Sequence, residues 1–183
     1  MRPAQRERGL VKTAPKRRSL APSIDIRLAS SLWDVQPQAE QTVRDAIEAA
    51  AAALSTADGE VSILLTDDSA IRALNRDWRG IDKPTNVLSF PAAKTTATAG
   101  AKMLGDIVIA YETLCRECDD EDRVFLHHLA HLTVHGFLHL IGYDHQTETQ
   151  ADEMEGLESK IMRRMKMPDP YLARDLGRDF GDA

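Results

Sequence analysis

Two periods of hydrophobic and polar residues follow one another along the first third of the chain. Residues 24–28 alternate apolar with polar side chains, which is the period of two expected of a half-buried strand. The Ala-rich stretch from Pro37 to Leu54 then places apolar side chains three and four positions apart, which predicts a helix that opens at the proline. The fold is therefore expected to begin near Ser23 with a strand and a helix.

A second strand and helix are predicted directly after the first pair. The aliphatic and β-branched residues 61–65 indicate a short strand, and Asp67 or Asp68 can cap the helix that follows it. Helical spacing puts three apolar residues on one face of that helix, where a core would cover them: Ile71, Leu74 and Trp78.

Two more strands and two long helices are expected in the rest of the chain. Residues 86–90 and 107–110 indicate short strands, and residues 91–103 between them show no period and predict a mobile loop. Helices are expected over about residues 122–140 and 147–165. The pattern predicts an α+β fold in which a small, mainly four-stranded mixed sheet packs with four to five helices.

Composition narrows the class of protein. The chain has 183 residues, of which 43% are hydrophobic and 28% charged, and these values fit one folded domain and exclude a disordered or fibrous protein. No apolar run approaches the roughly 20 residues of a membrane-spanning helix, and no apolar stretch follows the N-terminal arginines as in a secretory signal. The two cysteines, Cys115 and Cys118, fit a reducing compartment. We therefore expect a cytoplasmic protein with no membrane partner.

Charge is distributed unevenly and suggests domain boundaries. Residues 1–20 hold seven basic residues and one acidic residue, whereas the rest of the chain holds 16 basic and 28 acidic residues. We predict a basic, disordered tail over 1–22, a single domain over 23–167 and a C-terminal tail over 168–183. The first tail is read as a solvated extension, with a functional arm that contacts RNA as the alternative and an Arg-rich organellar transit peptide as a lower-ranked third. Because the body is acidic, no DNA partner is expected, and RNA would have to meet local basic patches or the tail.

All six histidines lie between residues 127 and 145, and three of them have the spacing of a metal site. His135 and His139 are four apart and would project from one face of a helix, one turn apart. Gly142 can adopt a positive φ and turn the chain so that His145 returns to the same point. Three imidazoles suit one Zn²⁺ ion and leave a tetrahedral position for water, as in catalytic, zincin-like sites.

The other three histidines are not assigned to the metal site, and Gly136 after His135 limits the type of enzyme that the site can belong to. His127, His128 and His131 are read as ordinary polar residues, although His131 can support a metal ligand. The spacing is also that of the metzincin proteases, but Gly136 stands where their general-base glutamate should be. A protease is therefore ranked low.

Three separated motifs resemble one known family. H-G-F-L-H-L-I-G-Y-D-H (residues 135–145), L-N-R-D-W-R-G-I-D-K-P-T-N-V-L-S-F-P (residues 74–91) and L-G-D-I-V-I (residues 104–109) are similar, in the same order, to the signature segments of the YbeY family of bacterial endoribonucleases and rRNA maturation factors. The resemblance covers about residues 23–167.

The resemblance implies a function and a set of site residues. It implies one Zn²⁺ ion on His135, His139 and His145, and an arginine at the position of Arg79 that matters for activity. The domain would be a metal-dependent hydrolase, a single-strand-directed endoribonuclease that acts in 16S rRNA 3′-end maturation and ribosome quality control. Its partners would be ribosomal RNA and the small ribosomal subunit or its assembly factors.

The chemistry of the remaining candidate residues is less specific. A guanidinium can bind two phosphate oxygens as a fork, which suits Arg79, but by pattern alone Arg72, Arg76 and Lys83 are equally plausible, and the four can form one basic patch. Trp78 and Phe90 can stack bases, yet their positions favour a core. Cys115 and Cys118 have acidic neighbours, which disfavour a thiolate, and Asp144 is read as a turn residue.

Two other functions stay open at this point. One is a zinc hydrolase that acts on a substrate other than RNA, against which the missing glutamate at Gly136 counts. The other is a non-enzymatic ribosome-assembly factor whose zinc is structural.

Overall fold

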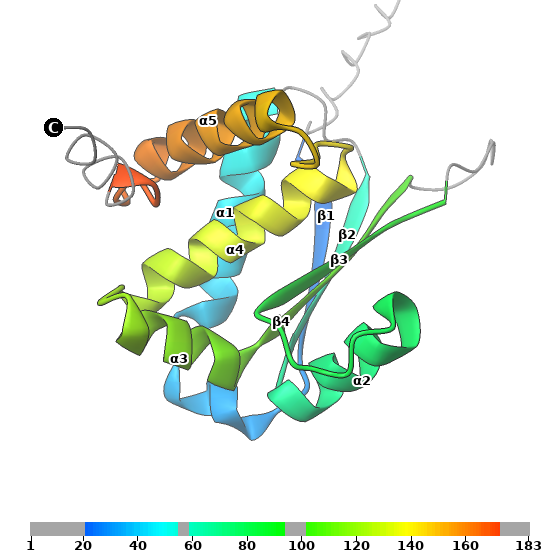
Figure 1. The fold of residues 1–183 in the computed structure, drawn as a ribbon. Helices are drawn as coiled ribbons and strands as arrows, with labels where there is room; N and C mark the ends of the chain where they lie inside the picture. Colours follow the sequence, from blue (N-terminus) through cyan, green and yellow to red (C-terminus); the bar gives the residue numbers. More distant parts are fainter. Residues whose placement is uncertain (1–20, 55–58, 94–101, 173–183) are drawn as a thin grey trace, which may run out of the picture.

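The computed structural model describes residues 21–54, 59–93 and 102–172 and confirms an α+β fold (Figure 1). The chain order of the elements is β1 (Ser23–Leu28), η1 (Ser31–Val35, a 3-10 helix), α1 (Ala39–Leu54), β2 (Glu60–Thr66), α2 (Asp68–Arg79), β3 (Val87–Pro91), β4 (Met103–Ala110), α3 (Tyr111–Asp120), α4 (Phe125–Leu140) and α5 (Glu148–Arg164).

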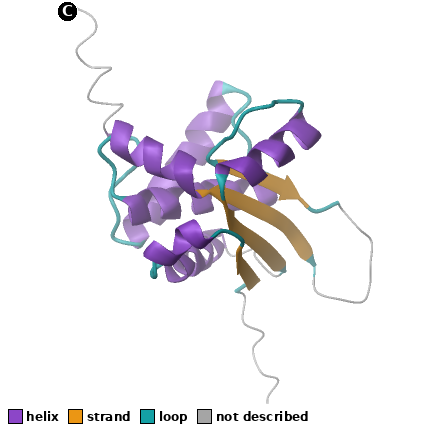
Figure 2. Ribbon diagram, turned by 90° about the horizontal axis from the view of Figure 1, so that it is seen from below, coloured by secondary structure: helices purple, strands orange, loops and turns teal. Residues whose placement is uncertain are grey.

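The four strands form one mixed sheet, as the sequence predicts. Their order is β1-β2-β4-β3, with β1, β2 and β4 parallel and β3 antiparallel to β4 at the edge. Figure 2 shows the strands side by side with helices around them. The parallel pair β1–β2 is joined through α1, which is the crossover helix that a parallel connection requires.

Alternate residues of the strands face two separate hydrophobic clusters. Ile63 of β2 and Ile107 and Ile109 of β4 belong to the main core, which they share with α1, α4 and α5. Val108 of β4 and Leu88 of β3 point the other way and pack with Ile71 of α2. Figure 1 accordingly shows α2 on one side of the sheet and the other long helices on the opposite side. The sheet is therefore covered on both faces.

Helix α4 packs closely against the sheet because Gly136 has no side chain. A Cβ atom at Gly136 would lie 3.0 Å from both Ile107 Cγ2 and Ser89 Oγ. The side of α4 that carries Gly136 therefore faces β3 and β4, and this fixes the rotation of the helix about its axis. Because Gly136 faces the sheet, this position has no space for a glutamate.

Three sequence expectations are corrected by the structure. The helix expected from about residue 122 begins at Phe125, because Asp122 adopts a left-handed conformation (φ 51°) in the turn before it. Residues 111–120, which had no predicted element, form α3, whose N-cap residue Ala110 makes no capping hydrogen bond and so gives no start signal. The strand expected at 107–110 begins at Met103, with a register irregularity opposite the start of β2.

Trp78 is the main error in the predicted core. The side chain was expected to face the core with Ile71 and Leu74, yet Trp78 is 72% exposed. It lies in the last turn of α2, beyond the buried Ile71 and Asn75 of that helix, and its ring contacts Phe90 of β3.

The predicted tails and the predicted loop lie largely beyond what the structure describes. Residues 1–20 of the N-terminal tail and 94–101 of the loop are outside the described residues. The chain after 167 is described as far as 172, and there Asp169 accepts a hydrogen bond from Ser159 of α5 at 2.8 Å. No helix in the described segments is long and apolar enough to span a membrane.

The close packing at Gly136 predicts a sharp contrast between two helical glycines. Gly136→Val should lower the free energy of unfolding by about 2 kcal/mol, because the added methyl groups meet Ile107 and Ser89. Gly156→Val in α5, where nothing lies within 4 Å of the added Cβ, should change it by less than about 0.5 kcal/mol. Urea unfolding midpoints measure both. Equal losses at the two sites would show that the α4–sheet contact is not tight.

Candidate metal centre

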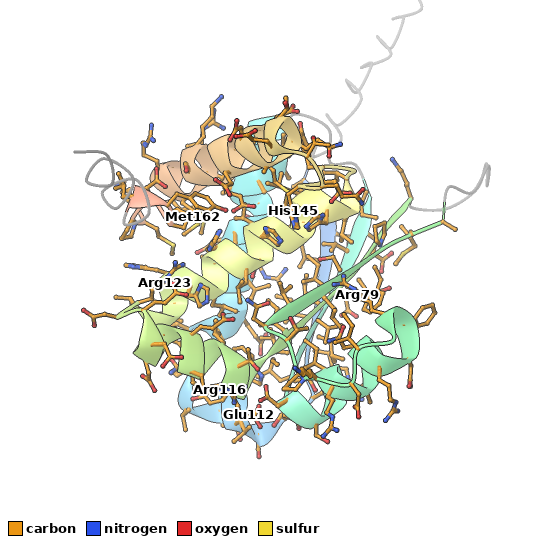
Figure 3. The ribbon with its side chains drawn as sticks, in the orientation of Figure 1. Arg79, Glu112, Arg116, Arg123, His145 and Met162 are labelled. Carbon is orange, nitrogen blue, oxygen red and sulfur yellow. The ribbon has the colours of Figure 1, made fainter. Side chains whose placement is uncertain are left out.

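The predicted histidine trio comes together at the C-terminal end of α4. His135 and His139 lie one turn apart on the helix, and α4 ends at Leu140. Gly142 then adopts a φ of 103°, and the N–H groups of Gly142 and Tyr143 donate to the carbonyls of His139 and Leu138. This turn returns the chain so that ligand nitrogens of His135, His139 and His145 all lie within 4.8 Å of one another. Figure 3 shows His145 beside this end of α4.

Two oxygen acceptors set the tautomers of the helical pair. His139 Nδ1 lies 3.0 Å from the carbonyl oxygen of Tyr143, and His135 Nδ1 lies 2.9 Å from Oε1 of Glu158. Because a carbonyl and an ionised carboxylate only accept hydrogen bonds, each Nδ1 carries the proton. Each Nε2 is then left with a lone pair.

The two Nε2 atoms lie close together, an arrangement that a shared cation would stabilise. His139 Nε2 lies 3.1 Å from His135 Nε2, and with both protons on Nδ1 no hydrogen bond can join them. Burial and the two neighbouring histidines lower the pKa of His139, so this side chain is neutral at physiological pH. A tetrahedral zinc ion with bonds near 2.05 Å needs nitrogens roughly 3.3 Å apart. The residues present therefore fit such an ion.

Glu158 is the functional residue that sequence reasoning missed. Its side chain is fully buried in α5 and bridges two histidines of α4: Oε1 accepts from His135, and Oε2 accepts from His131 Nε2 at 2.7 Å. Tyr171 also donates to Oε2. Burial alone would raise the pKa of Glu158, but the hydrogen bonds from His131 and His135 outweigh it and lower the pKa to about 2. The group is therefore a carboxylate that orients His135 and is held by His131.

A sequence signal for Glu158 exists, although it is weak. The residue shares the buried face of α5 with Met154, Ile161 and Met162, at helical spacing. A lone acid on an apolar helical face needs a partner, because a buried charge without one is costly. The partner is 23 residues away in the chain, so the pattern alone does not identify it.

A groove runs from the histidines along α4. It has a volume of about 380 Å³, which is within the usual size of a ligand site, and both His135 and His145 line it. Further along, His128 Nε2 lies 2.7 Å from Glu117, which also accepts from Asn86. Arg123 and Glu155 also line the groove. The candidate metal centre is thus open on one side to a cavity that can receive a substrate.

Comparison with known proteins identifies the family. The family model described as "Endoribonuclease YbeY" matches residues 26–166. The chain belongs to this family of endoribonucleases. A curated relative named "Endoribonuclease YbeY" from Bradyrhizobium sp. is 52% identical over 160 residues, which cover 84% of this chain and 95% of the relative. Another of the same name, from Rhodopseudomonas palustris, is 52% identical over 159 residues, covering 84% and 92%.

One solved structure is also similar to this chain. The solution structure of TM1509 from Thermotoga maritima is 23% identical, with a TM-score of 0.43, and covers 80% of this chain and 97% of its own. The resemblance inferred from the three motifs is confirmed by the family model and the curated relatives.

Arg79 comes from α2 and not from the helix and turn that carry the three histidines. It ends α2, is exposed, and has no side-chain hydrogen bond or ion pair within the described segments. Figure 3 shows Arg79 near β3, which in that view runs between it and His145. The structure brings together the three predicted metal ligands, and it places Arg79 at the end of α2, near β3.

The four predicted basic residues divide into two that are paired with aspartates and two that are not. Arg72 donates twice to Asp82, at 2.8 and 2.9 Å, and Arg76 donates to Asp77 at 2.9 Å. Like Arg79, Lys83 is exposed and has no ionic partner in the part of the chain that is described. The patch of four cations is therefore reduced to two that are free for an anionic ligand.

The expectation for the cysteines is confirmed. Both lie in α3, and burial raises the pKa of each thiol, that of Cys118 to about 11. Neither is a thiolate at neutral pH, so this pair offers no reactive nucleophile.

The bridge at Glu158 predicts a cost for a neutral substitute. Glu158→Gln should lower the free energy of unfolding of the metal-free protein by about 2 kcal/mol, because the amide N–H₂ would face one of the two imidazole N–H donors. Glu155→Gln, one turn earlier on α5, is the matched control and should be near neutral, because Glu155 makes no hydrogen bond or ion pair within the described ranges. Chemical denaturation in the presence of a chelator tests both variants; a neutral Glu158→Gln would contradict the bridge.

Proposed function

We propose that this protein is a zinc-dependent endoribonuclease that cuts single-stranded ribosomal RNA, including the 3′ precursor end of 16S rRNA, in rRNA maturation and ribosome quality control. The observation that carries the proposal is the pair of Nε2 atoms of His135 and His139, 3.1 Å apart, with His145 completing an open three-nitrogen site in a member of an endoribonuclease family. Zinc is the metal that three neutral imidazoles and an open position favour.

The roles of the residues follow from their contacts. His135, His139 and His145 would hold the ion, with the Glu158 carboxylate and the Tyr143 carbonyl keeping the two helical imidazoles in the right tautomer. A bound zinc ion supplies a Lewis acid and a water of lowered pKa. Arg79 would bind non-bridging phosphate oxygens and stabilise the charge that develops on phosphorus.

The position of Gly136 supports RNA rather than peptide as the substrate. Proteases with this histidine spacing need a glutamate next to the first histidine as general base. Here a side chain at 136 would meet Ile107 and Ser89 of the sheet instead of facing the groove. A phosphodiester needs less of such a base, because a metal and a guanidinium stabilise the charge of its transition state directly.

The partners are ribosomal RNA and the small ribosomal subunit or its assembly factors, met in the cytoplasm. The chain carries a net charge of −6, so a broad electrostatic grip on RNA is unfavourable. Recognition would have to come from local cations and from partner proteins that deliver the RNA.

Removal of one imidazole tests the catalytic metal. His139→Ala should lose bound zinc and lose cleavage of a 16S rRNA fragment that bears its 3′ precursor tail, because two imidazoles remain of three. His127→Ala, on the same helix but outside the trio, is the control and should keep both. Zinc content by mass spectrometry and cleavage on a sequencing gel are measured for each preparation. Equal cleavage by the wild type and by folded, zinc-free His139→Ala would refute a catalytic metal. A wild-type protein that holds zinc but does not cleave the RNA would favour the assembly-factor function.

Substitution of Arg79 tests the phosphate contact. Arg79→Ala should reduce the cleavage rate roughly 100-fold with zinc content unchanged, and Arg79→Lys should restore only part of it, because an ammonium lacks the two-pronged geometry of a guanidinium. Arg72→Ala removes a cation that Asp82 already neutralises and should have little effect. Single-turnover cleavage rates at saturating enzyme measure the effect of each variant. Similar losses of rate for Arg72→Ala and Arg79→Ala would show a general effect of charge and no specific phosphate contact by Arg79.

A further inference from the structure

The exposed indole of Trp78 is the surface feature that the proposed site leaves unexplained. The chain has two tryptophans: Trp33 is fully buried and donates to the Thr66 carbonyl at 2.9 Å, whereas Trp78 is 72% exposed. Leaving so large an apolar side chain in water gives up the free energy that its burial would contribute. A ligand that covers the ring would recover it.

Local structure holds Trp78 in place. Gly80 adopts the left-handed conformation (φ 72°) and its N–H donates to the carbonyls at the end of α2, so the helix stops directly after Arg79. On the sheet side, Phe90 of β3 contacts the indole edge-on, with ring centroids 5.8 Å apart. The ring is thus fixed from one side and exposed on the rest of its surface, as a stacking platform requires.

The charges around the indole indicate an anionic ligand. Arg79 follows Trp78 directly, and Lys83 is in the same loop after α2; neither has an ionic partner within the described ranges. The nearby carboxylates of Asp77 and Asp82 are already paired with Arg76 and Arg72. An aromatic face beside two free cations, on a chain whose body is acidic, matches a flat base joined to a phosphate.

We propose that Trp78 is the platform on which a base of single-stranded RNA stacks, next to the phosphate that Arg79 binds. This inference rests on the proposed function and adds a binding subsite to it. The strand that carries Phe90 also packs against α4, the helix of the metal ligands, so the platform has a fixed position relative to the histidines. Stacking favours single strands, because a base inside a duplex is already stacked on both faces.

A protein partner is the competing occupant of this surface. Ile81, which is 51% exposed, enlarges the apolar area. The free cations favour RNA, because the core of a protein interface is usually depleted in charged residues. The experiment below separates the two.

The fluorescence of the two tryptophans gives a direct test in the intact, zinc-loaded protein. The probe is a single-stranded RNA oligonucleotide with 2′-O-methyl sugars, checked on a gel to be intact after each titration. It should quench the exposed Trp78 and leave the buried Trp33 emission unchanged, so Trp78→Phe should lose the quenching and keep RNA affinity. Trp78→Ala should bind the same RNA about tenfold more weakly. Val35→Ala, at a residue of η1 that is 69% exposed, is the matched control and should bind normally.

Two further measurements show whether the contact is stacking. First, an oligonucleotide with abasic sites should bind the wild type and Trp78→Ala with equal affinity. Second, Trp78→Ala should leave the salt dependence of RNA binding unchanged, whereas Arg79→Ala should reduce the slope of that dependence by about one phosphate contact. Unchanged RNA affinity in Trp78→Ala would overturn the inference. If Trp78→Ala instead lost binding to proteins of the small ribosomal subunit and kept its RNA affinity, the surface would be a protein-binding site. Cleavage is scored separately: quenching without cleavage would refute the nuclease proposal alone, and cleavage with no role of Trp78 would refute this inference alone.

Discussion

The orientation of His135 in the candidate metal centre depends on one buried carboxylate. Glu158 has no access to solvent and accepts hydrogen bonds from His131, His135 and Tyr171. These donors supply the stabilisation that a buried charge needs, and in return the carboxylate fixes which nitrogen of His135 is free. The same contact joins α5 to α4, so one interaction both orients the His135 side chain and holds the two helices together.

Helix α4 lies between the sheet and α5, and its residues contribute both to packing and to the candidate metal centre. Gly136 lets the helix approach Ile107 and Ser89, while the neighbouring His135 binds Glu158 of α5 and lines the groove. A bulkier residue at 136 would push the helix from the sheet and change the direction in which both imidazoles point. Gly136 therefore has two effects: its packing leaves no room for the general-base glutamate of a protease, and it sets the orientation of the histidines on α4.

The acidic charge of the chain and an RNA substrate are compatible only if contacts are local. Arg72 and Arg76 are neutralised by neighbouring aspartates, which leaves Arg79 and Lys83 as free cations at the end of α2. The exposed Trp78 lies beside them. An aromatic ring and a few cations can select a single strand without a broad basic surface, because stacking does not depend on net charge.

The sequence by itself determined the strand and helix pattern, the order of the main motifs, the histidine trio and its glycine turn. These signals are local: a spacing of four on one helix and a positive φ within the next turn bring His135, His139 and His145 to one point. Only the tertiary structure decided that Glu158 supports the site and that Trp78 is exposed. Both depend on where separate elements end and meet, since Glu158 pairs with residues of another helix and Trp78 lies past the edge of the core. Helix α3 was missed for a related reason, because it follows β4 without a capping residue and is stabilised by packing instead.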